Sequence, residues 1–169
     1  MIRSAALALC SLALFVAPAV AQDSRLAPLL AEHERMERQF DPVTSGQNGD
    51  NAALSRLPDN SPAGVEARRT ALAALRPRLA ALNERRLSPT GQLNRTLLLR
   101  SIDDELESIS FDRGRLGGFG GGYDGLGRET PLRSREDAEA WITRMGLMAA
   151  SMNQGIENQR RGIATGWTQ

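Results

Sequence analysis

The sequence predicts an all-α fold with about four amphipathic helices and no significant sheet. Apolar residues recur at three- and four-residue steps in several segments, which is the spacing of one helix face. The pairs Ser61-Pro62 and Ser88-Pro89 predict helix starts, because serine caps an N-terminus and proline suits the first turn. No segment shows the two-residue alternation bounded by turn formers that predicts a strand.

The last segment, residues 134–167, predicts one long amphipathic helix. Ser134 and Asp137 have the spacing of a capping box, and Gly162 and Gly166 are stop signals. The apolar stripe of this helix predicts a buried core face. A cofactor or peptide groove is the alternative, because methionine surfaces adapt to ligands. The stripe consists of Trp141, Met145, Met148, Met152, Ile156 and Ile163.

A first helix is predicted over residues 25–40 and ends at Asp41-Pro42, because the residue before a proline avoids helical angles. Residues 42–61 are rich in turn formers and predict a polar loop. A second helix is predicted over residues 62–86, and Pro77 should kink or divide it.

A third helix is predicted over residues 89–109. Its short connection to the second helix predicts an antiparallel helical hairpin. A Gly-rich loop over residues 114–127 then leads to the last helix. The apolar residues expected to face the core are Leu26, Leu29, Leu30, Met36, Phe40, Leu72, Leu75, Leu79, Leu82, Leu93, Leu97, Leu99, Ile102, Leu106 and Ile109.

The N-terminus has the three-part plan of a secretory signal peptide, with Arg3, an apolar run over residues 5–16 and Ala19-Val20-Ala21. We expect cleavage after Ala21, which leaves residues 22–169 as one helical region. The apolar run is shorter than the roughly 20 residues that span a bilayer. We therefore expect an exported protein, periplasmic or secreted, without a stable membrane anchor after cleavage.

The charge balance and the cysteine content argue against a nucleic-acid-binding protein and against a disulfide-stabilised one. The 21 basic residues, all arginines, and 20 acidic residues leave a net charge of +1, so no strong field attracts nucleic acid. The single cysteine, Cys10, lies in the signal peptide, so we expect no disulfide. The second helix is Arg-rich, but an acidic third helix is its expected neighbour, and we predict solvated faces with some pairing between the helices.

No residue is assigned a catalytic, metal-binding or cofactor-binding role. His33 and Glu37 look like half of a zinc-protease motif, but that motif needs two histidines and a third ligand, and His33 is the only histidine. We interpret this turn as helix surface and expect no cofactor in this chain. With one histidine, a Ser-His-Asp triad has no support either.

Three other patterns are weak. Gly120, Gly122 and Gly125 satisfy a dinucleotide-binding pattern, but no strand precedes them. The loop that contains them is interpreted as a linker, with a substrate-facing loop as the alternative. The carboxylates at Asp103, Asp104, Glu105 and Glu107 are spread around a helix instead of converging. Asn94-Arg95-Thr96 is a glycosylation acceptor only if the source is eukaryotic.

Several stretches share their order and spacing with one bacterial family. They are Asp41-Pro42-Val43-Thr44 after the first helix; Leu87-Ser88-Pro89 and Asp104-Glu105-Leu106 in the third; and Glu136-Asp137-Ala138-Glu139-Ala140-Trp141, Arg144, Gln154-Gly155-Ile156 and Arg160-Arg161-Gly162-Ile163-Ala164-Thr165-Gly166-Trp167 in the last. Together they resemble the N-terminal part of the bacterial domain of unknown function family eight-eight-five. This chain departs from the family's pattern in the glycine content of residues 114–127.

The resemblance implies a mostly helical, exported protein similar to gluzincin-type zinc metallopeptidases. In such proteins the H-E-x-x-x-G-H zinc motif lies further along, and no residue of this chain matches it. We therefore expect an N-terminal helical scaffold region that is inactive alone, as a fragment, a truncated gene product or a degenerate paralogue, with zinc only in full-length members. Its expected partners are the missing C-terminal catalytic part or a peptide substrate. The alternative is a stand-alone periplasmic helical binding or interaction module.

Overall fold

The computed structural model describes residues 17–116, 130 and 132–167, with side chains from Gln22 onward. The regular elements of these residues are helices, and no strand occurs among them, so the all-α prediction is confirmed. Most of the predicted Gly-rich loop and the apolar run of the predicted signal peptide lie outside the described residues. None of the described helices is long and apolar enough to cross a membrane.

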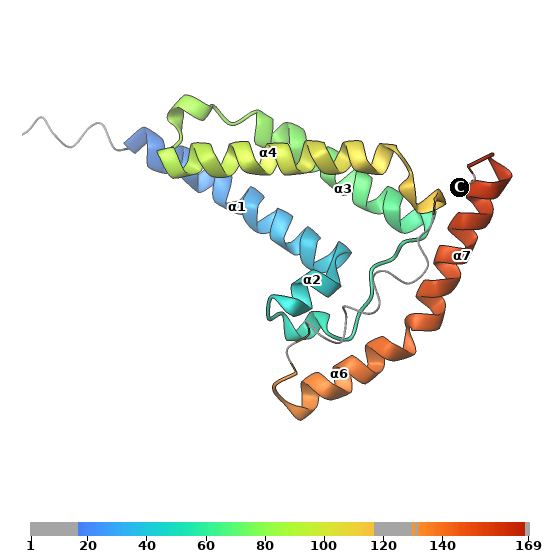
Figure 1. Ribbon diagram of the computed structural model, residues 1–169. Helices are drawn as coiled ribbons and strands as arrows, with labels where there is room; N and C mark the ends of the chain where they lie inside the picture. Colours follow the sequence, from blue (N-terminus) through green and yellow to red (C-terminus); the bar gives the residue numbers. More distant parts are fainter. Residues whose placement is uncertain (1–16, 117–129, 131, 168–169) are drawn as a thin grey trace, which may run out of the picture.

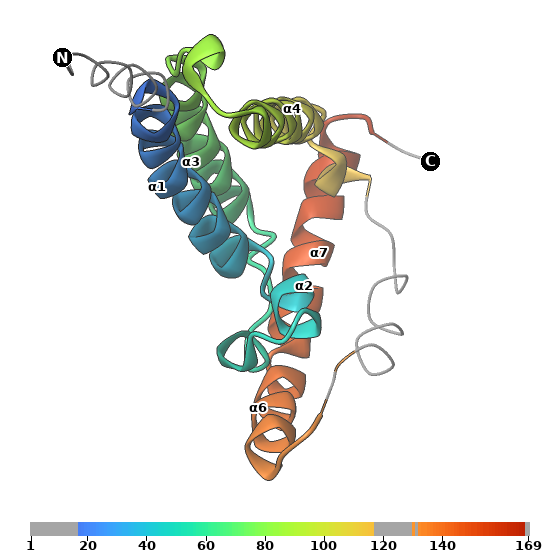
Figure 2. The same cartoon turned by 90° about the vertical axis from the view of Figure 1, so that its left-hand side faces the viewer.

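Three helices form the body of the molecule: α1 (Ala17–Phe40), α3 (Pro62–Ala80) and α4 (Pro89–Ser110). The helices α1 and α3 run side by side, and α4 packs against both (Figures 1 and 2). Apolar burial at their junction drives the packing. The buried core residues are Leu26, Leu29, Met36, Leu72, Leu75, Leu79, Leu87, Leu98 and Ile102.

The predicted helix starts are confirmed. The Oγ atom of Ser61 accepts from the backbone N–H of Gly64 at 3.1 Å, and the Oγ atom of Ser88 accepts from that of Gly91 at 3.0 Å. Each serine satisfies one of the amides that a helix start leaves without a partner. The helices α3 and α4 pack against each other across the short 3₁₀ turn η2 (Glu84–Arg86), as the hairpin prediction required.

Two helix boundaries and one buried helix face in the body differ from the prediction. The helix α1 begins at Ala17, upstream of the expected start, and α3 ends at Ala80, about one turn after Pro77. In α4 the buried leucine is Leu98, whereas Leu93 and Leu97 are exposed. Pro77 lies inside α3 and does not divide it, and the N–H of Ala81 donates to the carbonyl of Pro77 at 3.0 Å where the helix ends.

The predicted polar loop after α1 is partly helical. It contains α2 (Pro42–Gln47), capped by the Asp41 carboxylate at the N–H of Thr44 (3.0 Å), and the 3₁₀ turn η1 (Asn51–Ala53). Ala53 and Leu54 are fully buried. The segment is therefore a packed element that the final helices can contact.

The predicted single final helix is two helices, α6 (Arg135–Gly146) and α7 (Met148–Ala164), that meet at a bend (Figure 1). At the bend the N–H of Leu147 donates to the carbonyl of Arg144 at 3.0 Å, a tight 3₁₀ step next to the poor helix former Gly146. The capping box at Ser134 and Asp137 is confirmed, and the chain leaves α7 through Gly166, which has a φ of 77°. Gly162 lies inside α7 and does not end it.

Candidate functional site

The inward face of the C-terminal helices is polar. Its buried residues are Asp137, Arg144, Ser151 and Asn158, which recur every seven residues along α6 and α7. Seven residues are close to two helical turns, so these side chains share one face. The helices therefore meet the rest of the molecule through hydrogen bonds, where the sequence predicted an apolar seam.

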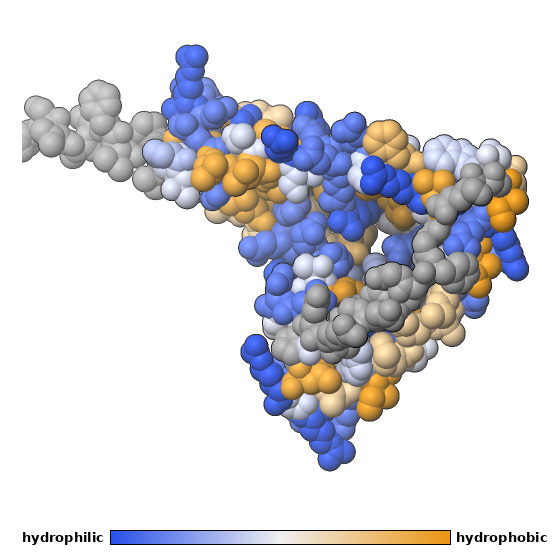
Figure 3. Space-filling view, viewed as in Figure 1, coloured by the Kyte–Doolittle hydropathy of each residue, from blue (hydrophilic) through white to orange (hydrophobic). Residues whose placement is uncertain are grey.

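The predicted apolar stripe is not a core face. Trp141, Met148 and Ile156 are half-buried, while Met145, Met152 and Ile163 are exposed, the last with an exposed fraction of 66%. Figure 3 shows hydrophobic surface along the edge of the molecule that α6 and α7 form. The prediction was wrong because helical spacing shows that a face exists but does not show what covers it. Further exposed members of this surface are Ile142, Leu147 and Trp167.

Arg144 joins α6 to the segment after α1. Its side chain has an exposed fraction of 0%, and its Nη2 atom donates to the carbonyl oxygens of Pro42 at 3.1 Å and Ala53 at 2.7 Å. Gly46 leaves room for it, since a Cβ there would lie 3.1 Å from Nη2. The guanidinium also lies 5.7 Å from the centre of the Trp141 ring.

Arg144 is a buried cation held by neutral groups. Within the described part of the chain, its Nε and Nη1 atoms have no hydrogen-bond partner, and no carboxylate pairs with it. Burial lowers the pKa of the guanidinium, and the positive charge of Arg56 lowers it further. The ordinary arginine pKa is so high that the group stays charged at neutral pH, so the carbonyl dipoles and the aromatic ring must offset the lost hydration.

A second set of polar contacts ties α7 to the start of α3. The amide of Gln154 accepts from the N–H of Asn60 at 3.0 Å and donates to the carboxylate of Asp59 at 2.9 Å. Asn158 donates to the carbonyl of Asn60 at 2.7 Å. These contacts join residues far apart in the sequence, so they fix the position of α7 on the body.

Asp59 predicts a pH dependence of stability. Hydrogen bonds from Ser61 and Gln154 hold the pKa of Asp59 below its ordinary value. The resulting stabilisation is present above the unfolded-state pKa of about 4 and is lost as the pH falls through the lower folded-state pKa. We expect D59N to remove this part of the acid destabilisation, an effect under about 1 kcal/mol because the carboxylate is exposed. Urea unfolding of the natural protein and of D59N between pH 7 and pH 2 would measure this effect. An equal loss of the free energy of unfolding in the two proteins as the pH falls would contradict the prediction.

Asp112 is the third contact between α7 and the body. It precedes the 3₁₀ turn η3 (Arg113–Arg115), and its φ of 46° is unusual for a residue other than glycine. Its two carboxylate oxygens accept from Arg161 at 2.9 and 3.0 Å, a bidentate pair, and Arg115 contacts the same carboxylate at 2.7 Å. One carboxylate thus holds two arginines where α4, η3 and α7 meet.

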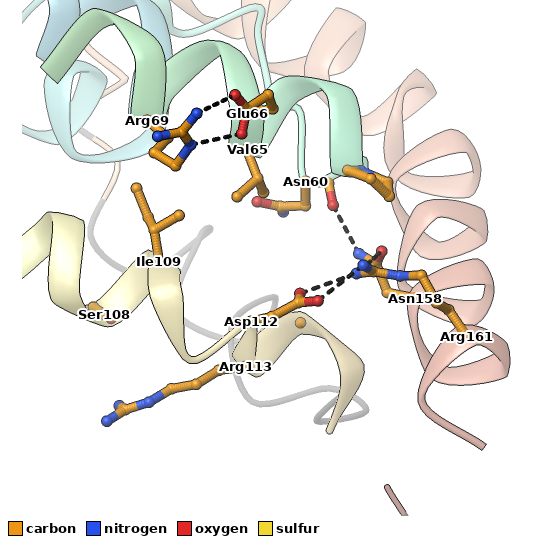
Figure 4. Close-up of a pocket in the computed structure, with 12 residues that line it drawn as sticks. Asn60, Val65, Glu66, Arg69, Ser108, Ile109, Asp112, Arg113, Asn158 and Arg161 are labelled. Carbon is orange, nitrogen blue, oxygen red and sulfur yellow. Dashed lines mark hydrogen bonds and ion pairs between the residues drawn. The ribbon is translucent and has the colours of Figure 1, made fainter. Parts of the chain in front are cut away.

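A cavity of about 450 Å³ lies at this junction (Figure 4). It is open to the surface and is lined by the start of α3, the end of α4, η3 and α7. Pro62, Val65 and Ile109 give it an apolar part. Its polar lining is made of Asn60, Glu66, Arg69, Ser108, Asp112, Arg113, Asn158 and Arg161, with Gly114 beside them.

His33 and Glu37, which look like half of a zinc-protease motif, lie one helical turn apart on α1. The Nε2 atom of His33 lies 3.6 Å from Glu37, and this nitrogen is buried without a hydrogen-bond partner among the described residues. No group of three histidine, cysteine or acidic side chains converges in residues 17–116, 130 and 132–167. His33 and Glu37 therefore lack the further ligands that zinc needs.

The carboxylates of α4 act as ion-pair partners, as predicted. Asp103 accepts from Arg76 at 2.5 and 3.1 Å, and Glu105 pairs with Arg68, both between helices. The glycosylation acceptor at residues 94–96 contains Arg95, which donates to the carbonyls of Leu79 and Ala80 at the end of α3. The glycine pattern at residues 120–125 lies outside the described residues.

Sequence reasoning assigned no structural role to Arg144, Gln154, Asn158 and Asp112, although Arg144 and Gln154 lie in the stretches that carry the family resemblance. The polar repeat at seven-residue intervals was a signal that could have found two of them. The contacts of Asp112 and Gln154 come from the tertiary structure, because their partners are 49 and 95 residues away.

Comparison with known proteins gives one family. The sequence profile described as "Bacterial protein of unknown function (DUF885)" matches residues 42–169. Neither a curated protein nor a solved structure matches the chain. The matched range begins at α2 and includes Arg144, the cavity and both C-terminal helices.

Proposed function

The chain belongs to the bacterial family of unknown function DUF885, and from this premise we propose that it is the helical scaffold region of an exported, zinc-peptidase-like protein. In this role α6 and α7 are held rigidly on the body by their polar face. Their apolar stripe packs against a second folded part, which contains the catalytic residues. The scaffold forms one wall of the peptide cleft of that part.

The observation that carries the proposal is the outward position of the stripe. Burying a large apolar side chain is worth roughly 1.5–3 kcal/mol, and contiguous exposed apolar patches mark interaction sites. Here the exposed stripe residues Met145, Met152 and Ile163 follow one another along two helices, and the exposed Ile142 lies next to them in the sequence. The inward face is already occupied by hydrogen bonds, so the stripe is the surface available for association.

The zinc chemistry belongs to the second part in this proposal. Its H-E-x-x-x-G-H motif would supply two histidine ligands and a glutamate base, whereas His33 and Glu37 do not form such a set. The contribution of this chain is mechanical, because a rigid wall fixes where a bound peptide lies relative to the reacting atoms.

A fusion protein tests the proposal. The chain would be fused to the part of a longer DUF885 protein that carries the zinc motif, and peptide hydrolysis would be measured. We expect activity that I142E with M152E abolishes, because two charges would be buried at the interface. E136Q with E157Q on exposed positions of the same helices is the control. Equal activity with and without the stripe charges would contradict the proposal.

Export gives a separate prediction. We expect the protein recovered from the periplasm of a Gram-negative host to begin at Gln22, because Ala19 and Ala21 have the small side chains that signal peptidase requires. Cleavage there would retain all the described core residues of α1, the first of which is Leu26. N-terminal sequencing checks this, and A19R with A21R should leave the full-length chain unprocessed. An unprocessed natural sequence would contradict the prediction.

The second candidate function is a stand-alone periplasmic interaction module. The observation that favours it is the body's own core of leucines, which α1, α3 and α4 close among themselves. This candidate predicts one sharp thermal transition and a monodisperse protein. The scaffold proposal predicts concentration-dependent association through the stripe, which I142E with M152E should remove.

A further inference from the structure

Two methionines of the outward stripe are open to solvent, while another methionine lies in the core. Met145 and Met152 have exposed fractions of 37% and 46%, whereas that of Met36 is 9%. Met148, which lies between the first two in the sequence, is half-buried. The chain thus holds two thioethers on side chains that solvent reaches and one that the leucine core shields.

The surface around Met145 and Met152 depends on them for its apolar character. Residues 145–156 contain no charged side chain and no histidine, and Arg144 just before them is fully buried. The large apolar side chains exposed in this range are Met145, Leu147 and Met152. Methionine therefore supplies two of the three exposed side chains that make this part of the stripe apolar.

Oxidation of these thioethers would change the chemistry of the stripe. Methionine is flexible and apolar, whereas methionine sulfoxide is polar and chiral and disrupts Met-rich interfaces. No thiol competes for the oxidant after the expected cleavage, because the single cysteine is Cys10. The exposed methionines are therefore the sulfur atoms that an oxidant meets first.

We propose that Met145 and Met152 are reversible oxidation sites for hydrogen peroxide, and that their oxidation makes the stripe polar and prevents its docking. In each step the peroxide O–O bond breaks and a sulfur–oxygen bond forms. The sulfur gives up an electron pair, and the rest of the peroxide leaves as water. In the reverse step a methionine sulfoxide reductase removes the oxygen as water, and a dithiol is oxidised to a disulfide. The effect on docking rests on the scaffold proposal, whereas the modification rests on exposure.

Oxidation at these positions spares the contacts that hold α6 and α7 on the body. Arg144 and Asn158 make those contacts from the inward face. We therefore expect the circular dichroism spectrum of the oxidised chain to stay unchanged. Oxidation of Met36 would differ, because this residue belongs to the core of α1, α3 and α4.

Peptide mass spectrometry tests the assignment of the sites. The full chain would be treated with hydrogen peroxide for increasing times, and the gain of one oxygen atom would be followed at each methionine. We expect Met145 and Met152 to react at least about tenfold faster than Met36 in the folded chain. In urea the three rates should become equal, because the core no longer shields Met36. Equal rates in the folded chain would overturn the proposal.

A double leucine variant tests the change in surface chemistry. M145L with M152L keeps the stripe apolar at similar volume and removes both oxidation sites. We expect peroxide to weaken the retention of the natural chain on a hydrophobic-interaction column, and methionine sulfoxide reductase with a dithiol to restore it. The leucine variant should keep its retention after the same treatment. Unchanged retention of the oxidised natural chain, or an equal loss in the leucine variant, would overturn the proposal.

The fusion with the zinc-motif part separates this proposal from the scaffold proposal. If the stripe packs against that part, Met145 and Met152 should oxidise at least about tenfold more slowly in the fusion than in the isolated chain. Equal rates in the fusion and the isolated chain would contradict the scaffold proposal. Fast and selective oxidation of the isolated chain would support the modification sites in either case.

Discussion

Replacing Arg144 by alanine is expected to lower the free energy of unfolding by about 3 kcal/mol. The change removes two hydrogen bonds from a charged donor, to the carbonyls of Pro42 and Ala53, and each such bond is worth about 1.5–3 kcal/mol. The Ala53 carbonyl keeps the N–H of Arg56 as a second donor at 3.1 Å. It also leaves a hollow where a large side chain was fully buried. Removal of a desolvated charge offsets part of this loss, which is why we expect less than the sum of the separate costs.

Two variants make the Arg144 prediction specific. R135A removes an arginine of the same helix whose side chain is 86% exposed and paired with Glu139, so we expect a change under about 1 kcal/mol. R144M keeps most of the volume without the charge, so its loss should lie between those of R135A and R144A. Chemical denaturation measures all three. A loss in R144A no larger than in R135A would show that the buried contacts do not hold α6.

The second large effect is expected at Gly162, where alanine should destabilise the protein by about 2 kcal/mol. A Cβ at this position would overlap the backbone carbonyl oxygen of Arg115. Backbone cannot swing aside as a flexible side chain can, so α7 must move away from η3. That movement would strain the Arg161–Asp112 pair, which bridges the same two elements.

Gly155 is the matched control on α7. It is a helical glycine with no atom within 4 Å of a Cβ built on it. We expect G155A to stabilise the protein by about 0.5–1 kcal/mol, because alanine is the better helix former. Changes of opposite sign in the free energy of unfolding of G162A and G155A, measured by chemical denaturation, would confirm that Gly162 is a contact position. Stabilisation in both variants would contradict it, and hydrogen exchange along α7 would show where the helix loosens.

Local chemistry made much of this fold predictable. Ser61, Ser88 and Ser134 cap helices through groups three residues away, so their role can be read directly from the sequence. The leucines of α1 and α3 follow helical spacing, and those expected to face the core do so. The ion pairs between α3 and α4 could also be foreseen, since complementary charges lie on the two helices of one hairpin.

The site was less predictable because its contacts join distant parts of the chain. Asn158 reads as an ordinary polar residue in an amphipathic helix, but it is buried because Asn60, 98 residues away, offers a carbonyl. Leu97 fits the helical pattern of α4 as well as Leu98 does. Which of the two is buried depends on the angle at which α4 meets its neighbours.

The sequence by itself determined that this protein is helical, where α3, α4 and α6 begin, and which leucines of α1 and α3 face the body's core. These properties depend on hydrogen bonds and side-chain spacing within a few residues. Only the tertiary structure decided that α6 and α7 turn their polar face inward through Arg144 and Asn158 and leave the apolar stripe exposed. The physical reason is that the carbonyls of Pro42, Ala53 and Asn60 accept hydrogen bonds from Arg144 and Asn158, so the polar face packs against the 42–60 segment.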